Sequence, residues 1–272
     1  MNQAATSAGT PVRSWREQRR LSQLALACEA NISQKHLSFI ESGRAAPSRE
    51  MVLHLAEHLD IPLRERNALL LTAGYAPIFR DRAITDPALE RARAAIDRVL
   101  KAHEPYPALT VDRHWMMVSA NSAVSGLLAG VDPALLNPPV NVMRLSLHPR
   151  DLAPLIQNLS EWRGHLLDRL RRQLRLTRDP EIEALLKELS GYHGNARKPE
   201  PRVSNEASDE IAVPLRLRTH AGLLSLFSTV TVFGTVVEIT LSELSVEAFY
   251  PADDATADIL RAAHSGSQMG LT

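Results

Sequence analysis

The residues of this chain that are best placed for chemistry have side chains suited to binding rather than to catalysis. Gln34, Lys35, Ser38 and Phe39 recur at spacings that put them on one side of a helix, while Leu37 falls on the opposite side. The polar side offers an amide, an ammonium, a hydroxyl and an aromatic ring. A helix that buries its leucine and presents these groups outward is suited to contact a polar, structured partner.

Two short helices joined by a tight turn position these side chains. We expect a first helix over 23–30, capped by Ser22, and a second over 34–42, capped by Ser33. Asn31 lies in the turn between them. Asparagine tolerates a positive φ better than other residues except glycine, so it suits the left-handed conformation that such a turn needs.

This layout matches the helix-turn-helix pattern, which places a small residue where the helices cross; Ala27 occupies that position. The pattern usually has glycine in the turn, and this chain has Asn31 instead. A purely structural helical hairpin shares some of these features. The charge distribution favours DNA. The whole chain has no net charge, yet residues 11–49 carry seven Arg or Lys against three Glu, which suits a phosphate backbone.

Composition limits the class of protein. A chain of 272 residues with 44% hydrophobic residues is long enough for two globular domains. It holds no run of about 18 apolar residues and no signal-peptide pattern, so we expect a cytoplasmic protein with no membrane contact. A single cysteine excludes an internal disulfide and a cysteine-built metal site.

The pattern along the chain predicts five segments. We expect a flexible tail at 1–10, an all-α domain of five helices at 11–78, a connecting helix within 79–103, an α+β domain at 104–263 and a second tail at 264–272. The connecting helix either packs on its own domain or contributes to a dimer contact.

Along the α+β domain, the pattern of hydrophobic residues changes from a helical period to an alternation of apolar and polar residues. Short β-prone runs occupy 108–112 and 115–120, and three more are expected at 211–218, 223–233 and 235–241. Two strands, a helical middle and a three-strand meander predict a five-stranded antiparallel sheet, which is the element order of PAS-type domains. The helices are expected over 149–177, 181–189 and 253–263, with a polar, turn-rich region at 191–209.

Long runs of the chain resemble a known family. LSQLALACEANISQKHLSFIESGRAAPSREMVLHLAEHLDIPLRERNALLLTAGYAP resembles helix-turn-helix regulators of the XRE class. The part after Glu104 resembles the ligand-binding domain of MmyB-like transcription regulators, through HEPYPALTVDRHW, NPPVNVMRLSLHP, LAPLIQNLSEWRGHLLDRLRR and TVVEITLSELSVEAFYPAD. Together they span about 12–263. The resemblance implies a bacterial transcription regulator whose PAS-like domain holds a small apolar molecule, with fatty acids as the ligand class.

The resemblance also assigns roles within the first domain. A Gln at position 23 binds phosphate in similar regulators, and Arg16 with Glu41 resembles a structural pair that ties the first helix to the third. Side chains at the start of the recognition helix reach base edges, where Gln pairs with adenine and Lys with guanine. Phe39 either meets a thymine methyl or folds back onto the domain. The expected contacts with an operator in double-stranded DNA are Gln23, Ser33, Gln34, Lys35, Ser38, Phe39, Arg44 and Arg49.

Candidates for the ligand site come from one strand, one loop and one helix. An Arg or His at a pocket mouth can hold a carboxylate. An alternative assigns the apolar members to the core and the polar ones to buried backbone groups. The expected lining residues are Trp115, Met117, Arg144, His148, Asn158, Trp162 and His165.

Other functional classes compete with this interpretation. The chain has no Gly-rich phosphate loop, no Gly-x-Ser-x-Gly and no His-Glu-x-x-His, so we expect no enzyme. No cofactor is expected beyond a bound fatty acid or other lipid. A haem or metal sensor would use His148, His165 or His193 as a ligand. In a third reading the second domain only dimerises. Because helix-turn-helix proteins commonly bind paired half-sites, we expect a homodimer.

Overall fold

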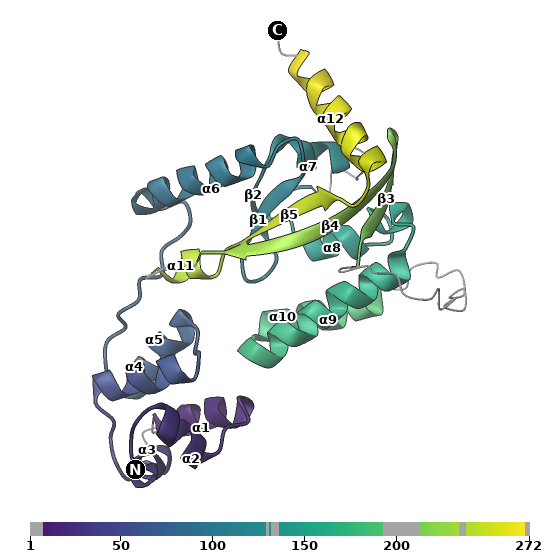
Figure 1. Ribbon diagram of the computed structural model, residues 1–272. Coiled ribbons are helices and arrows are strands. Elements are labelled where there is room, and N and C mark those ends of the chain that lie inside the picture. Colours follow the sequence, from purple (N-terminus) through teal and green to yellow (C-terminus); the bar gives the residue numbers. More distant parts are fainter. Residues whose placement is uncertain (1–7, 129–130, 132–135, 193–212, 234–237, 270–272) are drawn as a thin grey trace. The chain divides into compact units, whose positions relative to one another are not determined.

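The computed structural model describes residues 8–128, 131, 136–192, 213–233 and 238–269, and the chain divides into two compact units (Figure 1). The first unit comprises residues 1–84 together with Gly234–Ser242. The second comprises Thr85–Phe233 and Glu243–Thr272. The chain therefore passes between the units three times.

Five short helices build the first unit, as the sequence predicts. Serine hydroxyls cap three of them by accepting hydrogen bonds from backbone N–H groups three residues further on: Ser22, Ser33 and Ser48. Leucine, isoleucine and valine side chains from all these helices form one core. The helices are α1 (Gly9–Gln18), α2 (Gln23–Glu29), α3 (Gln34–Glu41), α4 (Arg49–His58) and α5 (Leu63–Thr72).

The first helix begins two residues before the predicted start at Pro11, so the expected tail at 1–10 is wrong for its last residues. Ala8 is 4% exposed. Gly9 lies so close to α3 that a Cβ there would clash with the carbonyl oxygen of Ile40. Only glycine allows the two backbones to approach in this way.

A buried ion pair ties α1 to α3, which confirms the predicted structural pair. The Arg16 guanidinium donates to both carboxylate oxygens of Glu41 at 2.7 and 2.9 Å, and its remaining nitrogen donates to the Leu21 carbonyl at 2.8 Å. The side chains of Arg16 and Glu41 are 8% and 2% exposed. The hydrogen bond to Glu41 raises the pKa of Arg16, so the pair stays charged.

The segment after α5 is held in place from two directions. The Asn67 side chain accepts hydrogen bonds from the N–H groups of Ile78 and Phe79 and donates to the Phe79 carbonyl. The second set of contacts comes from α11 (Ile239–Ser242), which belongs to the same unit. The N–H of Ile239 donates to the Arg80 carbonyl at 2.9 Å, and the Ile239 side chain is 1% exposed.

The second unit is built on a five-stranded antiparallel sheet, which confirms the predicted fold class. Its spatial order is β2-β1-β5-β4-β3. The strands are β1 (Ala108–Val111), β2 (Met117–Ala120), β3 (Leu215–Thr219), β4 (Gly222–Val232) and β5 (Ser245–Pro251).

The predicted strand at 235–241 is wrong. Residues 235–237 lie outside the described part, Ile239 begins the short helix α11, and the fifth strand is Ser245–Pro251. The run is rich in β-branched residues, which favour strands. Packing in the first unit overrides that local preference, because Ile239 is buried there.

Helices cover both faces of the sheet. Four consecutive residues of β1 and of β5 are buried, although side chains alternate between faces along a strand. Figure 1 shows α6 on one side and α8, α9 and α10 on the other. At the end where β4 begins and β5 stops, the Ser225 N–H donates to the Thr256 hydroxyl of α12. The bounds are η1 (Pro87–Leu89), α6 (Glu90–Ala102), α7 (Ser122–Leu127), α8 (Val142–Leu147), η3 (Ala153–Leu155), α9 (Leu159–Thr177), α10 (Pro180–Gly191) and α12 (Asp254–Met269).

Some boundaries differ from the sequence prediction. The long helix expected from 149 begins at Leu159, after the short 3-10 turn η3. The last helix runs beyond the predicted end at 263, so the expected tail at 264–272 is wrong as far as Met269. The predictions for residues 1–7, 193–212 and 270–272 lie outside the described residues.

The buried pair gives a prediction for stability. Replacing Glu41 with Ala leaves a buried guanidinium without its carboxylate, and we expect the free energy of unfolding of the first unit to fall by about 3–5 kcal/mol. Hydrogen exchange of the α3 amides in the full chain measures this. The control is Glu57→Ala, which removes an exposed carboxylate of α4 in the same unit and should change exchange little. Equal protection in the two variants contradicts the prediction.

Candidate functional site

The turn between α2 and α3 has the geometry that the helix-turn-helix pattern requires. Asn31 adopts a φ of 49°, which confirms the predicted left-handed turn residue. Ala27 is 1% exposed where the helices cross. Gly43, after the end of α3, has a φ of 71° and lets the chain leave the helix. Ala27 and Asn31 therefore allow the tight crossing of α2 and α3, and Gly43 ends α3.

The second helix of the motif divides into a buried and an exposed side. Leu37 and Ile40 are fully buried. Gln34 and Lys35 are exposed at the N-terminal end of α3, and Ser38 lies half-buried one turn further on. The side chains expected to reach base edges therefore share the solvent side.

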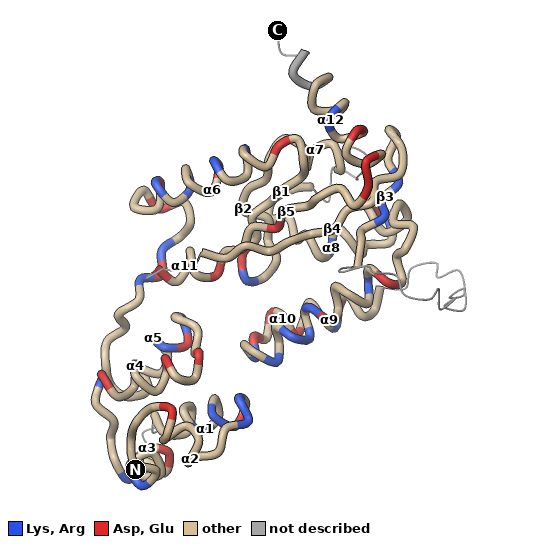
Figure 2. The backbone as a smooth tube through the Cα atoms, viewed as in Figure 1, with Lys and Arg blue, Asp and Glu red and all other residues tan. Residues whose placement is uncertain are grey.

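Phe39 stands among cations rather than in the core. Its ring is half-buried, the Lys35 ammonium lies 5.7 Å from the ring centroid, and the Arg44 guanidinium lies 4.7 Å from it. Arg44 also donates to the Ser42 hydroxyl at 3.0 Å. Cation–π attraction thus holds both charges beside the exposed side of α3. Figure 2 marks the basic residues along α1 and α3.

The remaining predicted DNA contacts lie around this helix. The Ser33 hydroxyl accepts from the His36 N–H as the cap of α3, and Arg49 is exposed at the start of α4. The Gln23 amide donates to the Glu41 carboxylate at 2.8 Å. In this structure Gln23 is therefore engaged by the buried pair, and a phosphate contact would use its other hydrogen-bonding capacity.

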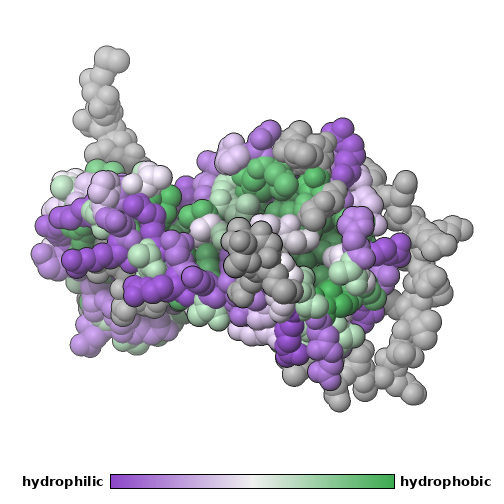
Figure 3. All heavy atoms as spheres, turned by 90° about the horizontal axis from the view of Figure 1, so that it is seen from above, coloured by the Kyte–Doolittle hydropathy of each residue, from purple (hydrophilic) through white to green (hydrophobic). Residues whose placement is uncertain are grey.

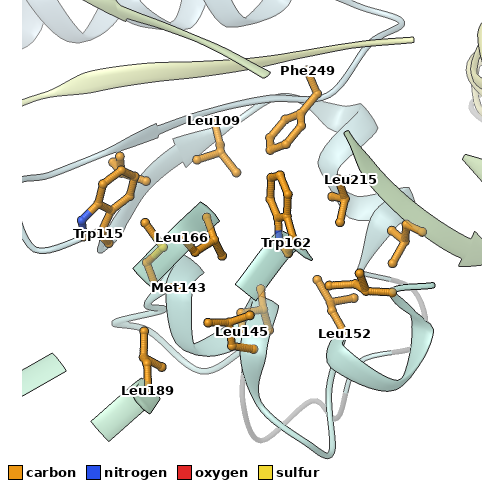
Figure 4. Close-up of a cluster of buried hydrophobic side chains, with 14 of the residues drawn as sticks. Leu109, Trp115, Met143, Leu145, Leu152, Trp162, Leu166, Leu189, Leu215 and Phe249 are labelled. Atoms are coloured by element: carbon orange, nitrogen blue, oxygen red, sulfur yellow. The ribbon is translucent and has the colours of Figure 1, made fainter. Parts of the chain in front are cut away.

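The second unit holds a small inner cavity between the sheet and α9. Its volume is about 80 Å³, and its walls are mostly apolar. Met117 and Trp162 line it, and both were predicted as ligand-site residues. Figure 4 shows Trp162 and Leu166 of α9 pointing toward Leu109 and Phe249 of the sheet.

Trp115 lies outside this cavity, and its expected place in the strand predicted at 115–120 is wrong. It has a φ of 66° in the turn before β2. The Asp112 carboxylate creates that turn by accepting from the N–H groups of His114 and Met116. The buried indole donates to Gln173 at 2.8 Å, and its ring lies 4.3 Å from the Arg169 guanidinium.

Two predicted polar residues contact acidic side chains. Arg144 donates to the Glu188 carboxylate with two nitrogens, the nearest contact being 2.8 Å, and this lowers the pKa of Glu188. The His148 ring lies 2.9 Å from the buried Asp151 carboxylate. Neither residue lines the inner cavity.

Asn158 and His165 lie at positions that suit a structural role rather than ligand binding. The Asn158 side chain donates to the Pro214 carbonyl and accepts from the Arg216 N–H, which joins the start of α9 to β3. His165 stacks on Trp162 at 5.5 Å. Burial lowers the pKa of His165, which disfavours the imidazolium that would pair with a carboxylate.

A larger cavity lies between α7, the β3–β4 turn and α12. Its volume is about 570 Å³, which falls in the usual range for small-molecule sites. Leucine and isoleucine side chains form much of its wall, and its ionisable lining residues are Arg218, His220 and His264. Figure 3 looks onto the end from which α12 projects, and hydrophobic residues gather there.

Sequence reasoning missed this cavity. The signals available were the helical spacing of Ile259, Leu260 and Ala263 and the basic residues around the turn at 220–222. Neither indicates a cavity unless β3, β4 and α7 are known to be neighbours. Within the described part of the chain, no group of three or more His, Cys, Asp or Glu side chains is arranged to hold a metal. His193 lies outside the described residues.

A helix-turn-helix unit with an exposed recognition helix, joined to a sheet domain with cavities, is the arrangement of a DNA-binding regulator with a ligand-binding domain. The comparisons give the family. Residues 92–263 match the MmyB-like transcription regulator ligand binding domain, and residues 12–66 match the helix-turn-helix family. The chain belongs to the MmyB-like transcription regulators. The families matched are regulatory rather than enzymatic.

Other comparisons add little. One similar solved structure is described as "Structure of an RNA-binding Light-Oxygen-Voltage Receptor", with 12% identity and a TM-score of 0.24. The match covers 96% of this chain and 64% of that one. No curated protein matches significantly. Among the described residues, no helix has the length and hydrophobicity that crossing a membrane requires.

The exposed side of α3 gives a prediction for DNA binding. We expect Gln34→Ala and Lys35→Ala each to cost roughly 1–3 kcal/mol on the cognate operator and little on random DNA, because base-edge contacts carry sequence information. Arg44→Ala should weaken binding to both the operator and random DNA. It should also reduce the slope of log affinity against log salt concentration by about one. Fluorescence anisotropy at several salt concentrations measures these effects. Lys101→Ala, which removes an exposed cation in the other unit, is the control. Equal losses on both DNAs for all three variants would refute this division of roles.

Proposed function

We propose that this transcription regulator binds its operator through α3 and that a small apolar ligand, a fatty acid or similar lipid, changes its operator affinity. The observation that supports DNA binding is that α3 has one buried side and one exposed side. Leu37 and Ile40 are fully buried, while Gln34 and Lys35 are exposed beside the cations around Phe39. This arrangement suits insertion into a major groove.

The cavities of the second unit support the ligand part. The larger one has about 570 Å³ behind mostly apolar walls, and burying an alkyl chain there is worth about 0.8 kcal/mol per methylene. A long alkyl chain gains enough free energy to bind at low micromolar concentration, even after the entropy cost of ordering the ligand and the side chains around it. A ligand of this class therefore has both the space and the driving force.

The connection between β4 and β5 supports communication with the DNA-binding unit. Its described part begins at Glu238, which is buried against residues of the first unit. The Glu238 carboxylate accepts from the Arg82 N–H at 3.2 Å and from its guanidinium at 3.3 Å. The Thr240 hydroxyl donates to the Arg82 carbonyl at 2.5 Å. We call the segment from Glu238 to Ser242 the clasp.

The clasp is continuous with two neighbouring strands of the sheet. A ligand that shifts β4 or β5 therefore acts on the first unit through this segment as well as through the linker at 84–85. For such a ligand to act as a signal, it must bind one conformer better than the other, because equal affinity shifts no equilibrium. The proposed regulation depends on this difference.

The ligand response gives a prediction. We expect operator affinity of delipidated protein to change when saturated fatty acids are added, and the effect to grow with chain length because each methylene adds burial. Glu238→Gln should weaken this response while leaving ligand-free operator affinity nearly unchanged. Electrophoretic mobility shift with titrated lipid measures both.

The control for the clasp is Asp168→Asn, which neutralises an exposed partner of Arg171 in α9. It should keep the full response to lipid. An operator affinity that no chain length changes would sink the regulatory proposal, and the second unit would then be a dimerisation module.

Oligomeric state is a separate prediction. One helix-turn-helix unit offers few base contacts, and related proteins bind half-sites about 34–36 Å apart as dimers. The α6 helix is a suitable contact because Val99 on it is 49% exposed. We expect light scattering at tens of micromolar to give a dimer, free and on operator DNA, and Val99→Glu to weaken it. A monomer under both conditions would count decisively against the dimer.

A further inference from the structure

The long strand β4 has one edge that is only partly paired. β3 pairs with it from Gly222 to Leu226, whereas β5 pairs with it from Leu226 to Val232. Figure 1 shows β4 extending well past β3. Among the described residues, no strand lies against the β3 side of β4 between Ser228 and Val232. We call this stretch the open edge.

The contacts of Ser225 show which backbone groups face the open edge. Its N–H donates to a hydroxyl of α12, and its carbonyl accepts from the Ala252 N–H just after β5, so Ser225 faces the β5 side. Backbone groups alternate between the two sides of a strand, and β4 pairs with β5 without a register shift. The N–H and C=O groups of Ser228, Val230 and Val232 therefore face the open edge.

The fold covers the outer edges of the sheet elsewhere. Along β3, the Gln157 N–H donates to the Arg216 carbonyl at 2.8 Å, and the Asn158 side chain accepts from the Arg216 N–H at 3.1 Å. Along β2, the Met117 N–H donates to the Val140 carbonyl at 2.8 Å. Loops that cover an edge prevent pairing with another chain. The open edge has no such cover among the described residues.

The open edge also lacks the side chains that protect exposed strands. Residues 228–232 read Ser-Thr-Val-Thr-Val, with no charge and no proline. Val230 and Val232 are 46% and 63% exposed. The residue opposite Val230 on β5 is Glu247, and Arg169 donates to its carboxylate at 2.7 Å. β-branched residues favour strands, so this stretch is suited to accept a further strand.

We infer that the open edge pairs antiparallel with the open edge of a second copy of this chain, so that the two sheets become continuous across a dimer. An antiparallel strand pair has two-fold symmetry, so an edge of this kind is complementary to itself. Like charges placed opposite each other destabilise strand pairs, and the two-fold axis brings none together here because the stretch is uncharged.

The chain's own residues before β3 do not continue along the open edge. Val213 and Pro214 lie outside β3, which begins at Leu215, so the pairing with β4 has ended at that point. The inference rests on the proposed function in that it requires the homodimer, and it names the contact that holds the homodimer together.

Val230→Pro tests this contact. It removes an N–H that faces the open edge and keeps the hydrogen bonds between β4 and β5, and edge strands accept proline at such positions. Each copy loses one hydrogen bond to its partner, so we expect the dissociation constant of the dimer to rise roughly tenfold or more. Sedimentation equilibrium of the full chain measures this constant, and thermal melting verifies that the variant is folded.

A second variant and a matched control complete the test. Val230→Lys places a charge on the edge without changing the backbone, and it should also weaken the dimer. The control is Leu223→Lys, at a position of β4 that is 43% exposed and paired with β3, and it should leave the dimer intact. A dimer that both Val230 variants leave unchanged overturns the inference, even if Val99→Glu weakens that dimer.

Hydrogen exchange resolved by residue gives an independent measurement. The amides of Ser228, Val230 and Val232 should exchange slowly in the dimer and quickly after dilution to monomer. Those of Thr229 and Thr231 donate toward β5 and should stay protected in both states. Fast exchange of the Val230 amide in a dimer refutes the inference and leaves the homodimer standing. A chain that is a monomer throughout refutes both, and protection that dilution does not change assigns the open edge to the chain's own residues.

Discussion

The buried contact between Arg16 and Glu41 sets the orientation on which DNA recognition depends. The two side chains share two hydrogen bonds, and Glu41 also accepts from Gln23, so one carboxylate joins α1, α2 and α3. A charge at this depth is stable only while it is paired. The recognition helix is therefore held at one angle, and Gly9 allows α1 to approach it closely enough for the pair to form.

In the second unit, helices cover the sheet and still leave space for a small molecule. Helices bury β1 and β5 from both sides, and Arg169 satisfies the buried Glu247 at 2.7 Å. Coverage is incomplete where α7 and α12 meet the β3–β4 turn, and the larger cavity lies there. At this end the described part of the sheet domain leaves an apolar cavity with space for a small molecule.

The clasp belongs to the first unit, although the chain on either side of it continues into the second unit. Glu238 accepts hydrogen bonds from Arg82, while Ile239 and Thr240 donate to the carbonyls of Arg80 and Arg82. Arg64 of α5 also holds this segment through Asp81, and Asn67 holds the residues just before it. Asp81 receives both the Arg64 guanidinium and, more distantly, the Thr240 hydroxyl. The contacts are short-range and directional, so they fix the clasp to the segment at 80–82 within the first unit.

The sequence by itself determined the elements whose signals are local. Serine caps, Asn31 in the turn and leucine periodicity specify the five helices and the exposed side of α3, because helical hydrogen bonds and caps connect residues close in sequence. The tertiary structure decided what depends on distant partners. A β-branched run became the clasp because Ile239 is buried in the other unit. Likewise, the cavity wall joins Leu127, Leu224 and Leu260, which only strand pairing and the docking of α12 bring together.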